Sequence, residues 1–254
     1  MSGHVVTDIA GGVLTLRFNR PDKKNAILAA MYADAAQALA AAEADAGIRV
    51  VVITGSGDSF TAGNDLKDFL ENPPKNNDAP VFRFMHGLAD FSKPVIAAIN
   101  GVAVGIGTTV LLHCDFAYAV PTAKFQLPFV NLALVPEFAS SLLLARFLGL
   151  RKAAELLMLG EVFDAETAHG LGLINAVVPA DQLEAVVKTK ATALAAKPPA
   201  ALRATKALLS ADKHEVTARI ALEAKVFGER LQSAELKEAI SAFFEKRAPD
   251  FSKF

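Results

Sequence analysis

Several apolar runs in the first two thirds of the chain have the spacing of β-strands. In "GGVLTLRFN", Leu14, Leu16 and Phe18 alternate with polar residues, which predicts a half-buried strand paired with "HVVTDI" in a hairpin. "RVVVITG" and "KPVIAAING" are unbroken apolar runs that end at glycine, and they predict buried strands over residues 50–54 and 95–99. "CDFAYAV" and "LINAVVP" predict two further strands.

Helical segments dominate the end of the chain. An early helix is expected over residues 28–46, which are rich in alanine and contain neither glycine nor proline. After residue 180, helices are expected over residues 181–195, 199–209, 214–230 and 233–247. The sequence therefore predicts an α/β fold, with a mixed body over residues 1–180 and a helical region over residues 181–254.

One apolar stretch resembles a membrane span. Residues 94–112, "PVIAAINGVAVGIGTTVLL", are uncharged and nearly long enough to cross a bilayer. Asn100, Gly101, Gly105 and Gly107 interrupt the run, which favours a buried strand, a glycine-rich turn and a buried helix. Both buried strands thus lead into a glycine-bearing loop and then a helix, which is a weak internal repeat.

Composition and charge narrow the class of protein. Of the 254 residues, 52% are hydrophobic and 21% are charged, so the chain can bury a large core. A formal net charge of -1 argues against nucleic acid or an anionic membrane as the main partner. Cys114 is the only cysteine, and "MSGHVVTDIAGG" lacks the features of a signal peptide, so a cytoplasmic protein is expected. The histidines lack metal-ligand spacing, and no metal site is expected.

A single carboxylate interrupts the apolar segment "FQLPFVNLALVPEFASSLLLA". Glu137 is its only ionisable side chain, and it directly follows Pro136. Burying a charge without a partner is expensive. Glu137 is therefore expected to face solvent, to be satisfied by neighbours, or to be useful because it is desolvated.

The two glycine-bearing loops are candidates for binding. In "GDSFTAGNDLKDF", the simplest interpretation is a tight turn before a helix that starts near Leu66 and is capped by Asp65. In "INGVAVGIGTTVLLHCD", glycine by itself indicates close backbone packing. Loops that lead from a strand into a helix also aim backbone N–H groups at one spot, where negative charge is favoured.

Taken in order, these motifs resemble the enoyl-CoA hydratase/isomerase, or crotonase, superfamily. The resemblance covers nearly the whole chain, from "LRFNRPDKKNAI" through "SFTAGNDLKDF", "KPVIAAINGVAVGIGTTVLLHCD" and "LGLINAVVP" to "AFFEKRAPDF". It implies a crotonase-like ββα spiral core and a C-terminal helical trimerisation region. A homotrimer or a dimer of trimers is therefore expected.

The resemblance also implies an acyl-CoA thioester as substrate. Members of the superfamily stabilise an enolate with two backbone N–H groups, and by motif position these are the N–H groups of Asn64 and Ile106. Donors fixed in advance on developing negative charge lower a barrier by several kcal/mol. The residues that the resemblance implies for substrate binding are Lys24, Ala26, Ile27, Ala62, Gly63, Asn64, Asp65, Leu66, Val104, Ile106, Gly107, Pro136 and Glu137.

Carboxylate positions distinguish reactions within the superfamily. Family hydratases use two glutamates, and the motifs place Thr109 and Phe129 at these positions, where neither side chain can act as a carboxylate. Glu137 falls where the Δ3,Δ2-enoyl-CoA isomerases carry a single catalytic glutamate. One carboxylate suffices to move a proton from C2 to C4, and a dry pocket raises its proton affinity.

Two other activities remain open at the level of sequence. A hydratase or another crotonase-type reaction would use Glu137 differently, and a non-catalytic acyl-CoA binding protein would need only the two loops. Arg20, Lys23 and Lys24 precede the segment that lines the CoA entrance in the superfamily, and they are either phosphate ligands or a solvated basic turn. No separate cofactor is expected, since coenzyme A is part of the substrate.

Overall fold

A mostly parallel sheet forms the centre of the fold. The computed structural model describes residues 3–74, 78–210 and 212–254. The larger sheet has the strand order β1-β2-β3-β5-β7-β10, in which β1 and β2 form an antiparallel hairpin and the other pairs are parallel. Its strands are β1 (Val5–Ala10), β2 (Val13–Phe18), β3 (Val50–Gly55), β5 (Val95–Ile99), β7 (Phe116–Ala119) and β10 (Ala176–Val177). Every second residue of β2 is buried, whereas β3 and β5 are buried throughout, as is usual for strands covered on both faces.

A second, smaller sheet has the order β4-β6-β8-β9. Its strands are β4 (Ser59–Thr61), β6 (Val102–Val104), β8 (Lys124–Gln126) and β9 (Phe163–Asp164). Successive stretches of chain give one strand to the larger sheet and the next strand to the smaller one, in the pairs β3 and β4, β5 and β6, and β7 and β8. This alternation winds the chain into a spiral, which accounts for the repeat seen in the sequence.

Helices cover the sheets and form the C-terminal region. The α-helices are α1 (Ala29–Ala44), α2 (Leu66–Glu71), α3 (Pro80–Ala89), α4 (Ile106–Thr109), α5 (Ser140–Leu148), α6 (Leu150–Ala154), α7 (Ala165–Gly170), α8 (Leu183–Ala195), α9 (Pro199–Leu209), α10 (Lys213–Arg230) and α11 (Ala234–Glu245). Shorter turns are the 3-10 helices η1 (Pro21–Lys23), η2 (Val110–His113) and η3 (Val130–Leu132) and the π-helical η4 (Glu155–Leu159).

The helical elements agree closely with the sequence analysis. The observed bounds of α9 are the predicted ones, and the ends of α1, α8, α10 and α11 lie within two residues of the predicted ones. Helix α1 ends before the predicted residue, because the buried ammonium group of Lys93 binds the carbonyl groups of Ala42 and Asp45 at this end. The division of the chain at residue 180 stays a prediction.

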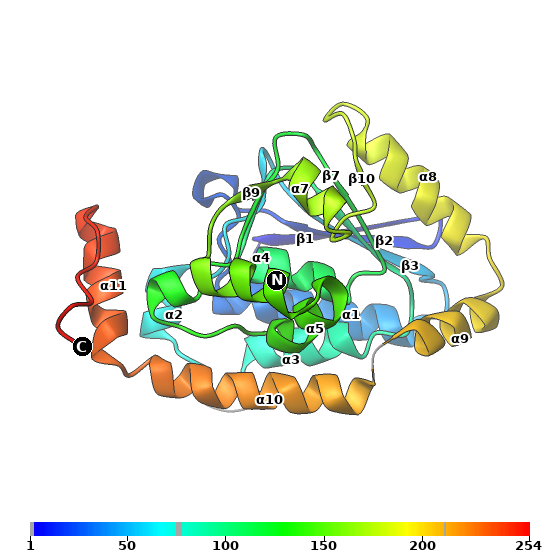
Figure 1. Ribbon diagram of the computed structural model, residues 1–254. Helices are drawn as coiled ribbons and strands as arrows, with labels where there is room; N and C mark the ends of the chain where they lie inside the picture. The colour runs from blue at the N-terminus through cyan, green and yellow to red at the C-terminus, as the bar shows by residue number, and fades with distance from the viewer. Residues whose placement is uncertain (1–2, 75–77, 211) are drawn as a thin grey trace.

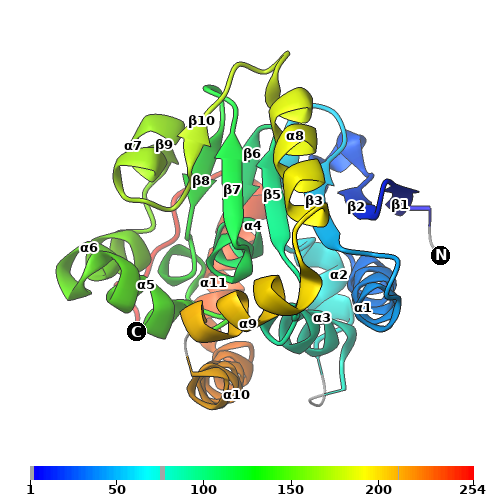
Figure 2. The same cartoon turned by 90° about the vertical axis from the view of Figure 1, so that its right-hand side faces the viewer.

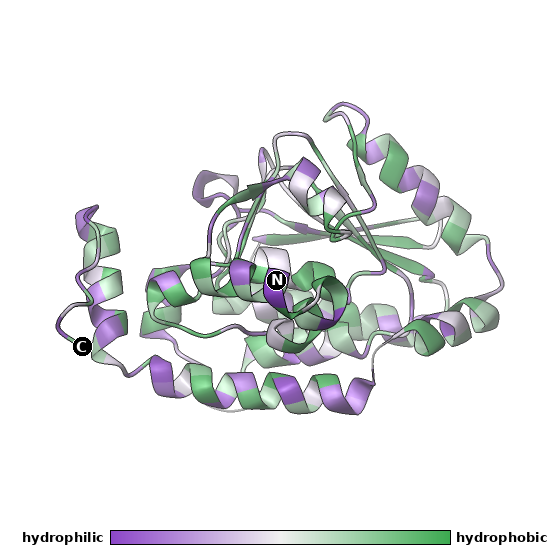
Figure 3. Cartoon of the chain, viewed as in Figure 1, coloured by the Kyte–Doolittle hydropathy of each residue, from purple (hydrophilic) through white to green (hydrophobic). Residues whose placement is uncertain are grey.

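The C-terminal helices differ in where they lie. Helix α8 packs on β3 and β5, whereas α10 packs on α3 and runs as a long helix along the lower edge of the molecule in Figure 1. Figure 2 shows α8 in front of the larger sheet, with α9 and α10 below it. Figure 3 shows that α10 alternates between hydrophilic and hydrophobic residues along its length. Helix α10 therefore has an apolar face to place against the body of the protein.

The uncharged run over residues 94–112 is divided among four elements. It forms β5, β6, α4 and most of η2, and Gly105 has a φ of 55° at the turn into α4. Within the described ranges, no helix is both long and apolar enough to cross a membrane. The interpretation of this run as core strand, turn and helix is confirmed.

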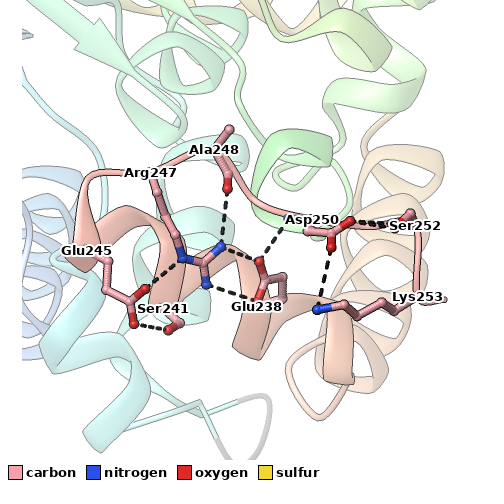
Figure 4. A network of polar contacts seen from close by, with 8 residues as sticks. All are labelled: Glu238, Ser241, Glu245, Arg247, Ala248, Asp250, Ser252 and Lys253. Carbon is pink, nitrogen blue, oxygen red and sulfur yellow. Dashed lines mark hydrogen bonds and ion pairs between the residues drawn. The ribbon is translucent and has the colours of Figure 1, made fainter.

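A polar network fastens the segment that follows α11 (Figure 4). The guanidinium group of Arg247 donates to the carboxylates of Glu238 and Glu245 and to the carbonyl group of Ala248. The backbone N–H of Asp250 donates to Glu238 at 2.8 Å. These hydrogen bonds from Arg247 and Asp250 lower the pKa of Glu238 to about 2. The tail thus folds back along α11.

Candidate active site

Glu137 is buried, so a glutamate facing solvent is excluded. Its side chain is 7% exposed, in the loop between η3 and α5. Phe138 and Ala139, which follow it, both have left-handed backbones, with φ values of 59° and 57°. Each such non-glycine residue costs about 1–2 kcal/mol. We call residues 137–139 the elbow, since this turn redirects the chain into α5.

Side chains from two other elements hold the elbow in place. The Nε2–H of His113, in η2, donates to the carbonyl oxygen of Phe138 at 2.8 Å, and the two rings stack with centroids 3.8 Å apart. Burial lowers the pKa of His113 to about 4, so this imidazole is neutral near pH 7. Glu223, in α10, accepts the backbone N–H of Ala139 at 2.6 Å. Hydrogen bonds to His113 and Glu223 thus hold the left-handed backbone of Phe138 and Ala139 in place.

The carboxyl group of Glu137 has one protein partner. Its Oε1 accepts a hydrogen bond from the hydroxyl group of Thr109 at 2.6 Å, and its Oε2 is buried without a partner among the described residues. Burial raises the pKa of Glu137 to about 8; the hydrogen bond from Thr109 acts against this shift, and the charge of Glu223 adds to it. A carboxyl group in this state is suited to accepting and releasing protons near neutral pH.

A cavity of about 250 Å³ connects Glu137 with the first glycine-bearing loop. Glu137 and Asn64 both line it, and Glu137 is the only carboxylate among the described lining residues. The remaining wall is mainly apolar and comes from α2, α3 and α10: Phe69, Val81, Phe82, Met85, Ile220, Ala221, Ala224 and Phe227. A larger cavity of about 440 Å³ lies beside Cys114 and Lys206, but neither Glu137 nor the two loops line it. We therefore place the candidate site in the smaller cavity.

The first loop leaves the N–H of Asn64 available. Asn64 and Ile27 form an isolated parallel bridge, in which Ile27 N–H donates to Gly63 O and Asp65 N–H donates to Ile27 O. In a parallel bridge of this kind the N–H of Asn64 points to the opposite side. The side chain of Asn64 accepts a hydrogen bond from the hydroxyl group of Tyr32 at 2.5 Å.

The second loop begins α4 and packs against the first loop. A Cβ atom added to Gly63 would lie 2.8 Å from the carbonyl oxygen of Val104, and one added to Gly107 would lie 2.7 Å from the side chain of Thr61. Only glycine permits this contact. Ile106 is the first residue of α4, so its N–H is one of the helix-terminal donors that have no intrahelical acceptor. The same helix ends at Thr109, which binds Glu137.

Other residues expected to bind substrate have structural partners. Asp65 caps α2 through the N–H groups of Lys67 and Asp68, as the sequence predicts. It also pairs with Arg20 at 2.7 Å, so this arginine holds the loop. Lys24 is exposed and has a left-handed backbone with a φ of 50°.

The remaining expected residues lie in or beside the two loops and the elbow. The N–H of Ala62 donates to Lys24 O, and the carbonyl group of Ala26 accepts from Arg20. Leu66 begins α2, and Pro136, directly before Glu137, is half-buried. Phe129 is buried and does not line the cavity.

The sequence analysis missed three contributors to the site. Tyr32 lies within a predicted helix, and no pattern marked its hydroxyl group. Thr109 was identified only as a residue that cannot replace a glutamate, yet it is the hydrogen-bond partner of Glu137. Glu223 carried a detectable signal, because it occupies a helical face with Val216, Ile220 and Phe227, where a charged residue is out of place.

Comparisons with known proteins agree with this geometry. The family model for enoyl-CoA hydratase/isomerase matches residues 8–253. Enoyl-CoA delta isomerase 2 from Homo sapiens is 37% identical over 245 residues, which are 93% of this chain and 62% of the human protein. The chain thus spans less than two thirds of that relative. A probable enoyl-CoA hydratase from Bacillus subtilis (strain 168) is 37% identical and covers 89% of this chain and 90% of its own length.

A solved structure shows the same fold. The crystal structure of an enoyl-CoA hydratase/isomerase from Pseudoalteromonas atlantica T6c has a TM-score of 0.94 and 40% sequence identity to the chain. The match covers 98% of this chain and 100% of the other. By family model, sequence and fold, the chain belongs to the enoyl-CoA hydratase/isomerase family of the crotonase superfamily.

Proposed function

We propose that the protein converts Δ3-enoyl-CoA thioesters into Δ2-enoyl-CoA thioesters. The observation that carries this proposal is that Glu137 is the only carboxylate among the described residues lining the cavity. Hydration by the family's usual route needs two carboxylates acting on one water. Here Thr109 and Phe129 stand at the two family positions, and Phe129 lies outside the cavity wall. A single base in a largely apolar pocket suits proton transfer along the acyl chain.

In the proposed reaction, the Glu137 carboxylate removes a proton from C2 of the acyl chain. The electron pair moves onto the thioester oxygen and gives a dienolate, which the N–H groups of Asn64 and Ile106 stabilise. Glu137 then returns the proton to C4, the double bond comes to lie between C2 and C3, and the negative charge leaves the oxygen. Coenzyme A is part of the substrate, and the proposed chemistry calls for no separate cofactor.

The pKa of Glu137 bears directly on this role. With a pKa of about 8, roughly one molecule in ten carries the ionised base at pH 7. The raised pKa also makes each ionised carboxylate a stronger base toward C2. The isomerase rate is therefore expected to rise with pH, with a midpoint well above that of an ordinary glutamate.

The substitution Glu137→Gln tests the proposal. It keeps the shape of the side chain and removes its basicity, so the isomerase rate is expected to fall by about two to four powers of ten. Binding of acyl-CoA, measured by calorimetry, should persist because the loop donors lie elsewhere in the chain. Normal turnover by Glu137→Gln would exclude Glu137 as the base.

Separate incubations with 3-hexenoyl-CoA and 2-hexenoyl-CoA distinguish the possible reactions. An unchanged mass with a shifted double bond, seen by chromatography against standards, supports isomerisation. A product heavier by one water supports the hydratase activity that the Bacillus subtilis relative's name suggests. Binding of both compounds without a product indicates an acyl-CoA binding protein.

A further inference from the structure

The elbow that carries Glu137 lacks a capping group of its own. Ala139 is the N-cap residue of α5, and its methyl side chain accepts no hydrogen bond from the first turn of that helix. Its left-handed backbone is also a conformation that alanine seldom adopts. A residue from outside the elbow is therefore needed to hold this turn.

Glu223 supplies the missing cap from a distant part of the chain. Its Oε2 accepts the N–H of Ala139 at 2.6 Å, and its Oε1 accepts the N–H of Ser141 at 3.0 Å together with the Ser141 hydroxyl group. Both backbone N–H groups can only donate, so both carboxylate oxygens act as acceptors, which suits the ionised form. Negative charge at a helix N-terminus is favourable.

The helix that carries Glu223 is also a wall of the cavity. Ile220 and Phe227, one turn before and one turn after Glu223 in α10, line the same cavity as Glu137. Glu223 itself is 6% exposed, and a buried carboxylate on an apolar helical face is costly unless its oxygens are satisfied. Here the three donors on the elbow and α5 satisfy it, and the same helix lines the cavity.

We propose that Glu223 is a positioning residue for Glu137. It holds the elbow in the conformation that presents Glu137 to the cavity, and it thereby ties the position of the base to α10, which forms one wall of that cavity. This inference rests on the proposed role of Glu137 as the base.

Other charged or titratable groups also face the elbow and the cavity. Tyr32 approaches from α1, where burial raises its pKa and the charge of Glu137 adds to the rise. His113 approaches from η2 and is neutral near pH 7, while Lys225 of α10 lines the cavity. Arg219 donates to Ser141 beside Glu223. Glu223 contacts the elbow directly; burial raises its own pKa, while the hydrogen bonds from Ser141 and Ala139 act against that rise. In its ionised form Glu223 disfavours ionisation of Glu137, so its removal should make Glu137 more acidic.

The substitution Glu223→Gln tests the inference, with Glu229→Gln on the exposed face of α10 as matched control. The titration of Glu137 is followed by carbon NMR of protein labelled at the glutamate carboxyl carbon, and its signal is assigned by its loss in Glu137→Gln. Glu223→Gln is expected to lower the Glu137 midpoint by about one pH unit, through lost repulsion and easier hydration. The pH profile of the isomerase should move in the same direction, with kcat falling about tenfold and KM changing less. The control should change neither.

An unchanged Glu137 midpoint in Glu223→Gln overturns the inference. If Glu223→Gln does not fold, the titration of Glu137 is followed in Glu223→Ala, which also removes the negative charge and in which the Glu137 midpoint should fall in the same way. An unchanged Glu137 midpoint in that variant overturns it as well. The titration needs no turnover, so its outcome stands apart from the fate of the proposed reaction. Full activity in Glu137→Gln would instead refute the proposed function.

Discussion

At the residue scale, ionisation of Glu137 lowers the free energy of unfolding. An ordinary glutamate has a pKa of 4.5, and burial raises that of Glu137 to about 8. Between these values the folded protein keeps a proton that the unfolded chain releases. The stability that depends on this proton is complete below about pH 4.5 and is lost as the pH rises through about 8.

The substitution Glu137→Gln should therefore stabilise the protein at high pH. Glutamine never ionises, so above pH 8 the variant is expected to be more stable than the wild type by at least about 1 kcal/mol. Below pH 4.5 the two proteins should unfold at similar temperatures. Thermal unfolding followed by circular dichroism from pH 4 to pH 9 measures the difference. A difference between the proteins that is constant across this range would contradict the raised pKa.

At the scale of elements, the two loops act through their backbones, and the side chain of Asn64 has a separate task. Asn64→Ala leaves the buried hydroxyl group of Tyr32 without its acceptor. This variant should therefore lose stability for a reason unrelated to the reaction. Combining it with Tyr32→Phe removes both partners. We expect this double variant to keep its activity within about tenfold, and Asn64→Pro, which removes the N–H donor, to lose about a hundredfold or more.

Turnover rates of these variants with 3-hexenoyl-CoA provide the measurement. Melting temperatures serve as the control for misfolding, since proline also restricts the preceding residue. If the double variant is as inactive as Asn64→Pro, the amide side chain of Asn64 takes part in the reaction, and the assignment to its backbone is wrong.

The long elements were predictable from the sequence, and of the short ones only a few were, such as β10 and the start of α2. Strands β3 and β5 each contain five or more buried residues in a row, and α9 has the predicted ends. Strands β4, β6, β8 and β9 have only two or three residues, which is too few for any period to appear. They form because the longer strands bring them side by side.

The same contrast holds for the candidate site. Glu137 was conspicuous because it is the only charge in an apolar segment. Thr109 and Glu223 touch the elbow from positions 28 and 84 residues away from their partners in the chain. Such pairings follow from tertiary structure, and no local pattern specifies them.

At the scale of the whole molecule, large apolar side chains remain exposed on α9 and near the α5–α6 junction. Leu208 and Leu209 of α9 are 88% and 82% exposed, and Phe147 and Leu150 near the α5–α6 junction are also exposed. Such surfaces usually mark an interface. We expect a homotrimer or a dimer of trimers, as the resemblance implies.

Light scattering at micromolar concentration tests the assembly. We expect a mass of three or six times 26.8 kDa. The variant Leu208→Ser/Leu209→Ser should associate less if α9 takes part in the contact, while Leu222→Ser on α10 serves as an exposed comparison. A monomeric mass for the wild type would contradict the predicted trimer or dimer of trimers.

The hydrogen bond between Glu223 and Ala139 also has a consequence for the order in which the parts of the site are synthesised. The two residues are 84 positions apart in the chain. At about 5–20 residues per second, a ribosome therefore synthesises the elbow several seconds before it synthesises Glu223. During that interval the nascent chain carries Glu137 but lacks the residue that holds it in place, and strands β9 and β10 are made before that residue is. A premature stop codon between the end of β10 and Glu223 should therefore yield a fragment that has all the strands of both sheets but lacks a working site.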